Sequence, residues 1–424
     1  MLCYSKRMNT PKISSAMGLL AVLSLVYLLN FLDRTLIYIL FPAIKKEMVL
    51  SDMQLAALGT TSFVLFYTSL GLPFGRLADR VSRRGMIAAG LVTWSLASAA
   101  TSLATGFWSL FFCRVLVGIG EASLGPAAMS LLADKFPAER RATAQSVYSA
   151  GVPLGAAAAF WLGGYIGDAH GWRTAFVALG LPGVALAGIV MLLVEPKRTS
   201  AAVQRRPFLA DLTTILRSPG LPRVLAGLAL VAIAANSLSI WVPTWLVRER
   251  GFAVGEVGQL AGMIMATAGL AGTLGGGALA DAWQRRSPQG RAYFVASLAG
   301  LAAGAWVVLL QGPTGATMIA AYAVLAFTGL GWLGPAAAEV QARVPAELRG
   351  LGIAVYFLVV NLVGYGIAPL VIGGISDRLV APGLGQALLI LPVCCIAAAG
   401  VLGASGWRSS RSTLAGSPAV PRSA

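Results

Sequence analysis

Long apolar runs, separated by short polar segments, dominate the chain from residue 17 to residue 405. A helix needs about 20 residues to cross the hydrocarbon core of a bilayer. The pattern therefore predicts an all-α membrane protein with twelve transmembrane helices. The expected spans are 17–41, 53–75, 86–104, 107–132, 142–167, 173–194, 223–247, 257–280, 292–311, 315–340, 351–375 and 384–405.

The composition agrees with a bilayer environment, since 57% of the residues are hydrophobic and only 11% are charged. A net charge of +16 could also indicate nucleic-acid binding, so the positions of the charges decide. With the N-terminus placed inside, 24 of the 32 Lys and Arg residues fall in inner segments and six in outer ones. The positive-inside rule then predicts that both termini are cytoplasmic, and the basic charge needs no nucleic acid to explain it.

Three motifs recur at nearly one offset along the chain. "GRLADRVSRRG" at 75–85 returns as "GALADAWQRRS" at 277–287, "GPAA" at 125–128 returns at 334–337, and "PAERR" at 137–141 returns as "PAELR" at 345–349. The offset of 202 to 209 residues spans six predicted helices. The chain is therefore expected to contain two six-helix bundles in the same orientation, the parallel repeat of a secondary transporter.

The repeat fixes the expected domains. A basic, proline-containing segment between the halves holds a short amphipathic stretch at 208–216, typical of a linker that lies along the membrane surface. The predicted boundaries are a cytoplasmic tail at 1–16, an N-terminal bundle at 17–194, a cytoplasmic linker at 195–222, a C-terminal bundle at 223–405 and a cytoplasmic tail at 406–424.

A resemblance follows from these motifs. "GRLADRVSRRG" resembles the loop between helices 2 and 3 that marks the major facilitator superfamily, with Ser82 where many members have glycine. "LNFLDRTLI", "GWRTAFVALGLPG", "WVPTWLVRERG" and the segment from "WSLASAATS" to "LLADKFPAERRA" resemble its spinster branch, over about residues 17–400. The resemblance implies a proton-driven carrier of lysolipids or sphingoid-type lipids. It also implies an essential Asp-Arg pair at Asp33 and Arg34, and a functional arginine and glutamate at Arg114 and Glu121.

The residues themselves single out the same four positions, because each of them places a charge inside a predicted span. An ionisable residue there costs about 2.5–3.5 kcal/mol or more, so it needs a reason. A rise of about 1.5 Å per residue puts Asp33 and Arg114 at one depth, with Glu121 two turns deeper on the face of Arg114. We expect one polar stripe from Asp33 through Arg114 towards Glu121.

The repeat provides a comparison for this stripe. In the second half, Ala323 takes the place of Arg114 and Leu330 that of Glu121. Since the scaffold recurs without the charges, the asymmetry favours function over packing, although a buried ion pair that only fixes the helices remains the alternative. The hypothesis is that Glu121 or Asp33 takes a proton when its arginine is drawn away, and that Arg114 then meets an anionic headgroup.

Arg34 fits this pattern less well. It is rotated by about 100° from Asp33 and cannot fully share its face. Two alternatives stay open: its head extends outward to the interface, or it binds a partner elsewhere.

Two further groups complete the candidate residues. Charged and small residues of the two repeated loops are expected to form a cytoplasmic gate, with each aspartate near a helix N-terminus of the opposing bundle. Polar residues on helices 1, 5, 7 and 11 are expected to line the cavity, although hydrogen bonding to a neighbouring helix is the commoner role. The gate residues are Gly75, Asp79, Arg80, Arg83, Gly277, Asp281 and Arg285, and the lining residues are Asn30, Tyr148, Asn236, Tyr356 and Asn361.

The sequence thus predicts a proton-coupled transporter of an anionic or zwitterionic amphiphile, working by alternating access as a monomer. An organic-anion symporter and a multidrug exporter are the alternatives. An enzyme is not expected, because the only histidine, His170, lies in a short outer loop and no nucleophile-base pair is visible. No cofactor, metal or nucleic acid is expected, and the proton is the predicted coupling ion. The excess of arginine over lysine, with abundant alanine and glycine, suggests a bacterial cytoplasmic membrane.

Overall fold

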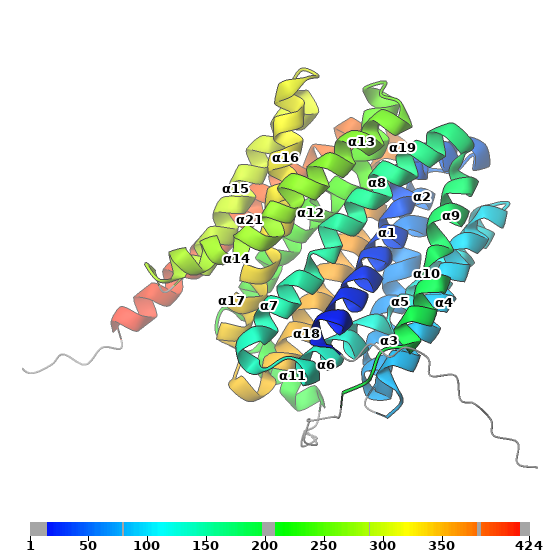
Figure 1. The fold of residues 1–424 in the computed structure, drawn as a ribbon. Coiled ribbons are helices and arrows are strands. Elements are labelled where there is room, and N and C mark those ends of the chain that lie inside the picture. The colour runs from blue at the N-terminus through cyan, green and yellow to red at the C-terminus, as the bar shows by residue number, and fades with distance from the viewer. Residues whose placement is uncertain (1–14, 79, 197–207, 288, 380–382, 416–424) are drawn as a thin grey trace, which may run out of the picture.

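The computed structural model describes residues 15–78, 80–196, 208–287, 289–379 and 383–415. Within them, twelve helices are long and apolar enough to cross a membrane. The predicted number of spans and the all-α class are therefore confirmed. Figure 1 shows the helices running side by side, with the first half of the chain beside the second.

Several spans consist of two or three consecutive helical segments. The first half contains α1 (Ala16–Met48), α2 (Asp52–Ala56), η1 (Ala57–Thr61), α3 (Ser62–Ala78), α4 (Arg83–Ala100), η2 (Thr101–Leu103), α5 (Phe107–Glu121), α6 (Leu124–Lys135), α7 (Ala138–Ser149), α8 (Gly151–His170), α9 (Trp172–Gly180) and α10 (Pro182–Met191). Between the halves lies α11 (Phe208–Leu216). The second half contains α12 (Leu221–Glu249), α13 (Val254–Ile264), η3 (Met265–Gly269), α14 (Leu270–Gln284), α15 (Gly290–Gln311), α16 (Ala316–Gly331), α17 (Leu333–Arg343), η4 (Ala346–Leu348), α18 (Arg349–Val360), η5 (Asn361–Ile367), α19 (Ala368–Arg378), α20 (Gly383–Leu388) and α21 (Ile390–Ala415).

The sequence repeat recurs in the irregular parts of the helices. The second membrane span passes through a π-helical segment at Ala57–Thr61, and the eighth span passes through one at Met265–Gly269. The fourth membrane span breaks between α5 and α6, and the tenth span breaks at the equivalent place between α16 and α17. Departures from α-helical geometry at matching positions support one ancestral six-helix unit. A π-helical segment is also a place where a helix can kink. Such segments occur frequently at functional sites.

Helix α1 lies in the interior of the molecule. The Ser15 hydroxyl caps its start by accepting a hydrogen bond from the Gly18 N–H at 2.9 Å. It packs along α8 and also contacts α12 of the other half. All ten residues from Leu32 to Phe41 are buried, so protein surrounds this stretch of helix on every side. A charged side chain in this stretch therefore faces protein whichever way it points.

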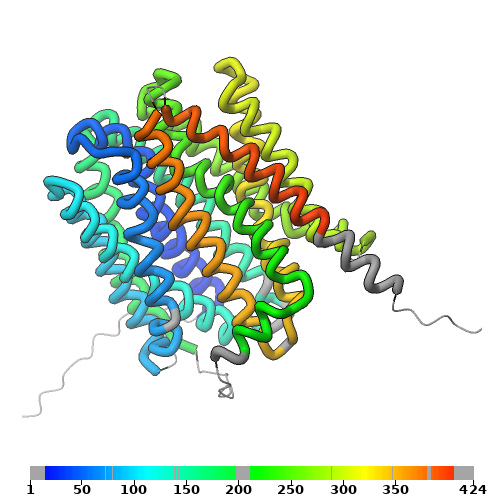
Figure 2. Tube along the Cα trace, turned by 180° about the vertical axis from the view of Figure 1, so that it is seen from behind, coloured from blue at the N-terminus to red at the C-terminus, as the bar shows by residue number. Residues whose placement is uncertain are grey.

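The two halves are joined at one end of the molecule, here called the Asp52 end. Arg248 of the second half donates to the Asp52 carboxylate at 2.7 Å, and the Ser376 hydroxyl donates to it at 2.6 Å. The Asp377 carboxylate accepts the N–H groups of Asp52 at 2.7 Å and Met53 at 2.9 Å. These bonds across the boundary close the Asp52 end. Figure 2 shows from behind how the two halves lie against each other.

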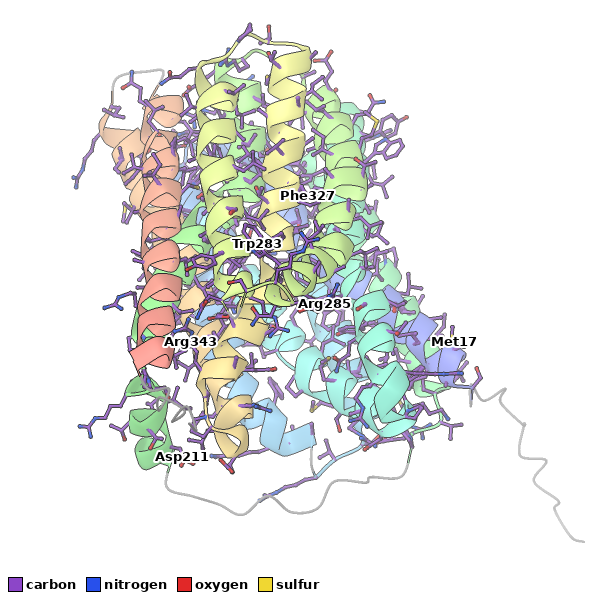
Figure 3. The ribbon with its side chains drawn as sticks, turned by 90° about the vertical axis from the view of Figure 1, so that its left-hand side faces the viewer. Met17, Asp211, Trp283, Arg285, Phe327 and Arg343 are labelled. Carbon is purple, nitrogen blue, oxygen red and sulfur yellow. The ribbon has the colours of Figure 1, made fainter. Side chains whose placement is uncertain are left out.

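The opposite end, here called the linker end, holds Arg83 and α11. Among the described residues, each ion pair at this end joins two residues of the same half: Arg83 with Asp134 and Glu195, Arg291 with Asp281, and Arg343 with Glu339. Figure 3 shows Arg285 and Arg343 on the second half, apart from Met17 at the start of α1. That the linker end faces the cytoplasm stays a prediction of the positive-inside rule.

Candidate functional site

An ion pair between Arg34 of α1 and Glu121 of α5 lies at the centre of the first half. The Arg34 Nη2 and Nε atoms donate to Glu121 Oε2 at 2.8 and 3.2 Å. The Arg34 side chain is 10% exposed and that of Glu121 is fully buried. Arg34 therefore stands between Glu121 and the rest of the interior. Of the two alternatives for Arg34, binding to a partner is correct and an outward orientation is wrong.

Two properties of the helices explain this pairing. Because α1 is enclosed on all sides at this level, no direction leads Arg34 to the membrane surface. Side chains on a helix also lean towards its N-terminus. Arg34 thus reaches back along α1 towards the linker end, where Glu121 lies two turns beyond Arg114.

Asp33 and Arg114 meet at the depth that the sequence predicts, but through a different contact. Arg114 Nη1 donates to the backbone carbonyl of Asp33 at 3.4 Å. The Asp33 carboxylate instead accepts a hydrogen bond from the Ser98 hydroxyl of α4 at 2.7 Å. Ser98 is a site residue that the sequence reasoning missed. A hydroxyl at the depth of Asp33 on a neighbouring helix was the only available signal.

Arg114 is a fully buried cation without a full set of partners. Its side chain is 0% exposed, and its Nε and Nη2 atoms have no hydrogen-bond partner among the described residues. The Phe63 ring lies 5.8 Å from its Cζ atom. Since a buried polar group without a partner is costly, this guanidinium is suited to an anion or to water.

Aromatic rings enclose the head of Arg34. The Arg34 Cζ atom lies 4.4 Å from the centroid of Phe63, 4.7 Å from that of Phe31 and 4.9 Å from that of Tyr67. Cations within about 6 Å of a ring face are attracted to it. The sequence reasoning missed these rings, although Phe63 and Tyr67 are spaced four residues apart as on one helix face.

A small cavity lies between the two halves, close to this group. About 40 Å³ of it is open to water-sized molecules, and its walls are mainly apolar. Phe31 belongs both to this wall and to the rings around Arg34. The polar lining groups come from both halves: Thr35, Tyr38, Ser239 and Tyr365.

The five predicted lining residues lie elsewhere, and their lining role stays a prediction. None of them is among the residues that line the cavity between the halves. Asn30 is buried beside Glu121, and Tyr148 stacks on Tyr27 with ring centroids 4.1 Å apart. Tyr356 packs edge-on against Trp332 at 6.3 Å. Asn236 lies against Gly364 of η5, and Asn361 begins η5 and is half-buried.

Arg83 is the most strongly bound of the predicted gate residues. Its guanidinium contacts Asp134 and Ser130, the Glu195 carboxylate at 2.8 Å and the Pro196 carbonyl at 2.8 Å. Burial alone raises the pKa of the Glu195 carboxyl, but hydrogen bonds from Arg83 and Ser82 outweigh it and hold the pKa below its ordinary value. Arg83 thus connects the start of α4 to α6 and to the segment that follows α10, all within the first half.

The other described gate residues form no ion pair or hydrogen bond between the halves within the described ranges. Asp281 binds Arg291 of its own half at 2.8 Å, and Arg80 and Arg285 are exposed. A side chain added at Gly75 or Gly277 would meet open space. Asp79 lies outside the described residues. The gate stays a prediction for a state in which the linker end is closed.

Known proteins resemble this chain over most of its length. Residues 23–369 match the family model described as Major Facilitator Superfamily. An "MFS-type efflux pump" of Mycolicibacterium smegmatis is 32% identical over 385 residues, 89% of each chain. "Protein spinster homolog 1" of Homo sapiens is 33% identical over 245 residues, which are 55% of this chain and 46% of that protein.

Solved structures share the fold. A crystal structure of a bacterial homolog to the human lysosomal transporter spinster, in an inward-facing and occupied conformation, has a TM-score of 0.80 and 26% identity over 94% of this chain and 98% of that one. The inward-facing and unoccupied form has a TM-score of 0.77 at 25% identity. The predicted resemblance is therefore confirmed for both the family and the spinster-like branch.

Proposed function

The chain belongs to the Major Facilitator Superfamily, and from that premise we propose that this multi-pass secondary transporter uses protons to move an anionic or zwitterionic amphiphile. A lysolipid or a sphingoid-type lipid is the kind of substrate meant. The spinster-like relatives support the choice of branch. Movement by alternating access follows from two repeated bundles with a site between them.

The observation that carries this proposal is the state of Arg114. A fully buried guanidinium that forms no ion pair among the described residues is an expensive feature to keep. It is explained if the anionic group of a substrate completes its hydrogen bonds during transport. The cavity between the halves is too small for a hydrocarbon chain in this state, but its mainly apolar walls would suit the hydrocarbon part of an amphiphile once the halves move apart.

The neighbouring carboxylates provide the proton step. In an apolar site, a carboxylate that loses its cationic partner favours the protonated form. Glu121 is ionised in its ion pair with Arg34. If a substrate anion or a helix movement withdraws Arg34, Glu121 can take a proton. The Asp33 carboxylate accepts a hydrogen bond from the neutral Ser98 hydroxyl and forms no ion pair in the described part of the chain, which makes it the second candidate.

The closed Asp52 end corresponds to one of the two states of the alternating-access transport cycle. If the linker end is cytoplasmic, as predicted, the structure corresponds to an inward-facing form. Opening the other way then requires Asp52 to release Arg248 and Ser376.

Drug export is the second candidate function. It is favoured by the relative of Mycolicibacterium smegmatis, which is described as an efflux pump and matches 89% of this chain. The mainly apolar walls of the cavity would also suit hydrophobic drugs once the halves move apart.

Proteoliposomes with an imposed pH gradient test the proposal. We expect uptake of a lysolipid to follow the gradient in the native chain and to fall at least about tenfold in Glu121→Gln or Asp33→Asn. Glu347→Gln is the matched control, because Glu347 is exposed and far along the chain from the site. Full proton-driven uptake in both site variants would refute the coupling role, and transport of drugs alone would favour the exporter.

A further inference from the structure

The cage around Arg34 has the composition of a binding site for an organic cation. We define the Arg34 cage as the rings of Phe31, Phe63 and Tyr67 together with the Glu121 carboxylate. Three ring faces within 4.4 to 4.9 Å and a carboxylate at 2.8 Å surround one positive charge. Aromatic cages of this kind recognise alkylammonium groups, because the ring faces attract a cation that water hydrates weakly.

Other rings hold the cage in shape. Phe63 and Tyr67 stack on each other at 5.2 Å, and Tyr27 meets Phe31 edge-on at 5.1 Å. Tyr27 in turn stacks on Tyr148 of α7. The cage is therefore supported by three helices and does not depend on Arg34 alone for its form.

The cage adjoins the cavity between the halves through Phe31. Phe31 is part of both walls, and Tyr365 of the second half lines the same cavity. The Arg34 side chain keeps 10% exposure while Glu121 keeps none. A cation arriving through the cavity would meet Arg34 before Glu121, so Arg34 occupies the position that such a cation would take.

Charge balance decides which ligand can exchange with Arg34. Asp33, Arg34, Arg114 and Glu121 together carry no net charge when all are ionised. A ligand that brings only an anion leaves a carboxylate without its cation unless a proton is added. A ligand with both an ammonium and an anionic group adds no net charge: its ammonium pairs with Glu121, and its anion pairs with Arg114 and with the displaced Arg34.

Phe63 is close to both sites that such a ligand would use. Its ring centroid is 4.4 Å from the Arg34 Cζ atom and 5.8 Å from the Arg114 Cζ atom. The cation site and the anion site of the first half thus adjoin the same ring, a proximity suited to the headgroup of a zwitterion.

From these contacts we infer that the Arg34 cage is a subsite for the alkylammonium group of a zwitterionic substrate, and that Arg34 fills it as a tethered stand-in when no substrate is bound. The inference rests on the proposed function for the assignment of this region to the substrate path. It adds a cation subsite to the anion site at Arg114.

Equilibrium binding in detergent, without a pH gradient, tests the cage. The probes are radiolabelled hexadecylphosphocholine, which carries an ammonium group, and hexadecyl phosphate, which does not. We expect Phe63→Leu and Tyr67→Leu each to weaken binding of the phosphocholine about tenfold, while binding of the phosphate changes less than about twofold. Phe63→Tyr keeps the ring and should retain binding. Phe112→Leu is the matched control, because Phe112 is an exposed ring on α5.

A second measurement guards against loss of folding. Arg34→Ala empties the cage, and tetramethylammonium chloride should then raise the thermal stability of the variant more than sodium chloride of equal concentration. Equal losses for both alkyl probes, or no rescue by tetramethylammonium, would overturn the inference. Neither assay contains a proton gradient, so the cage and the coupling role can fail separately.

Discussion

Arg248 donates to Asp52 at 2.7 Å across the boundary between the two halves of the chain. Asp52 is almost fully buried, and Lys45 of its own half also binds its carboxylate. One carboxylate therefore collects two cations and the Ser376 hydroxyl, while Asp377 holds the N-terminus of α2 from the other side. The halves are fastened here by charge as well as by packing.

Asp52→Asn should loosen the Asp52 end, because hydrogen bonds to charged groups contribute about 1.5–3 kcal/mol. Ser239→Cys, placed in the cavity wall of a chain whose four natural cysteines are replaced, reports the opening. We expect an impermeant thiol reagent presented to the Asp52 end of oriented vesicles to label it about tenfold faster. Glu347→Gln, an exposed residue outside the site and the predicted gate, should leave the rate unchanged. An unaltered rate in Asp52→Asn would show that charge does not hold this end.

Arg114 and Arg34 should respond oppositely to replacement by methionine. Arg114→Met removes a cation that lacks a carboxylate, so thermal stability should stay level or rise. Arg34→Met leaves Glu121 buried without its cation, which should cost about 3–5 kcal/mol. Thermal unfolding of the purified variants checks this.

The double variant Arg34→Met with Glu121→Gln provides the control for that comparison. It should recover part of the stability lost in Arg34→Met, since the unpaired carboxylate is gone. Lysolipid uptake should be lost in Arg114→Met although the protein remains stable. A marked fall in the stability of Arg114→Met would mean that Arg114 has partners of structural importance.

The sequence was sufficient to predict the helices and four charged residues that lie buried within them, Asp33, Arg34, Arg114 and Glu121. Length and hydropathy predict the twelve spans, and the repeat predicts matching halves, because both depend on local pattern. The depth estimate also placed Asp33 and Arg114 at one level, which the contact at 3.4 Å confirms.

The pairing of the charges could not be predicted in the same way. Arg34 and Glu121 are 87 residues apart, and their contact depends on how α1 is rotated within its bundle. The rotation is set by packing on α8 and α12, which a periodic pattern does not specify when a helix is apolar on all faces. The Asp52 cluster was missed because Asp52 starts a span, where an acidic residue is expected on local grounds alone.

Acid should weaken the linker end through Glu195. Its pKa is lowered in the folded state, so its contact with Arg83 adds stability above the ordinary carboxyl pKa of 4.5 and loses it as the pH falls through the lowered value. The native chain should be more stable than Glu195→Gln at pH 7, and the difference should shrink below about pH 4. Thermal unfolding across this range checks the sign. Glu347→Gln serves as the control and should show no such convergence.

At the contact between α8 and α13, the two halves meet through glycine instead of charge. Gly164 of α8 faces Gly258 of α13, and a Cβ atom at position 164 would lie 2.8 Å from the Gly258 Cα atom and 3.1 Å from the Val254 carbonyl. Because both neighbours are backbone, Gly164→Ala must push the two helices, and with them the two halves, apart. In the Ser239→Cys assay, labelling should rise several-fold, whereas Gly300→Ala, which meets open space on α15, should have no effect.

The double variant Asp52→Asn with Gly164→Ala tests whether the two contacts hold the halves together independently. Gly164 and Asp52 lie on different helices and have different neighbours, so independent effects should add in free energy. The labelling rate of Asp52→Asn with Gly164→Ala should then equal the product of the two single increases. A rate no higher than that of Asp52→Asn alone would mean that the halves separate as rigid bodies once either contact is broken.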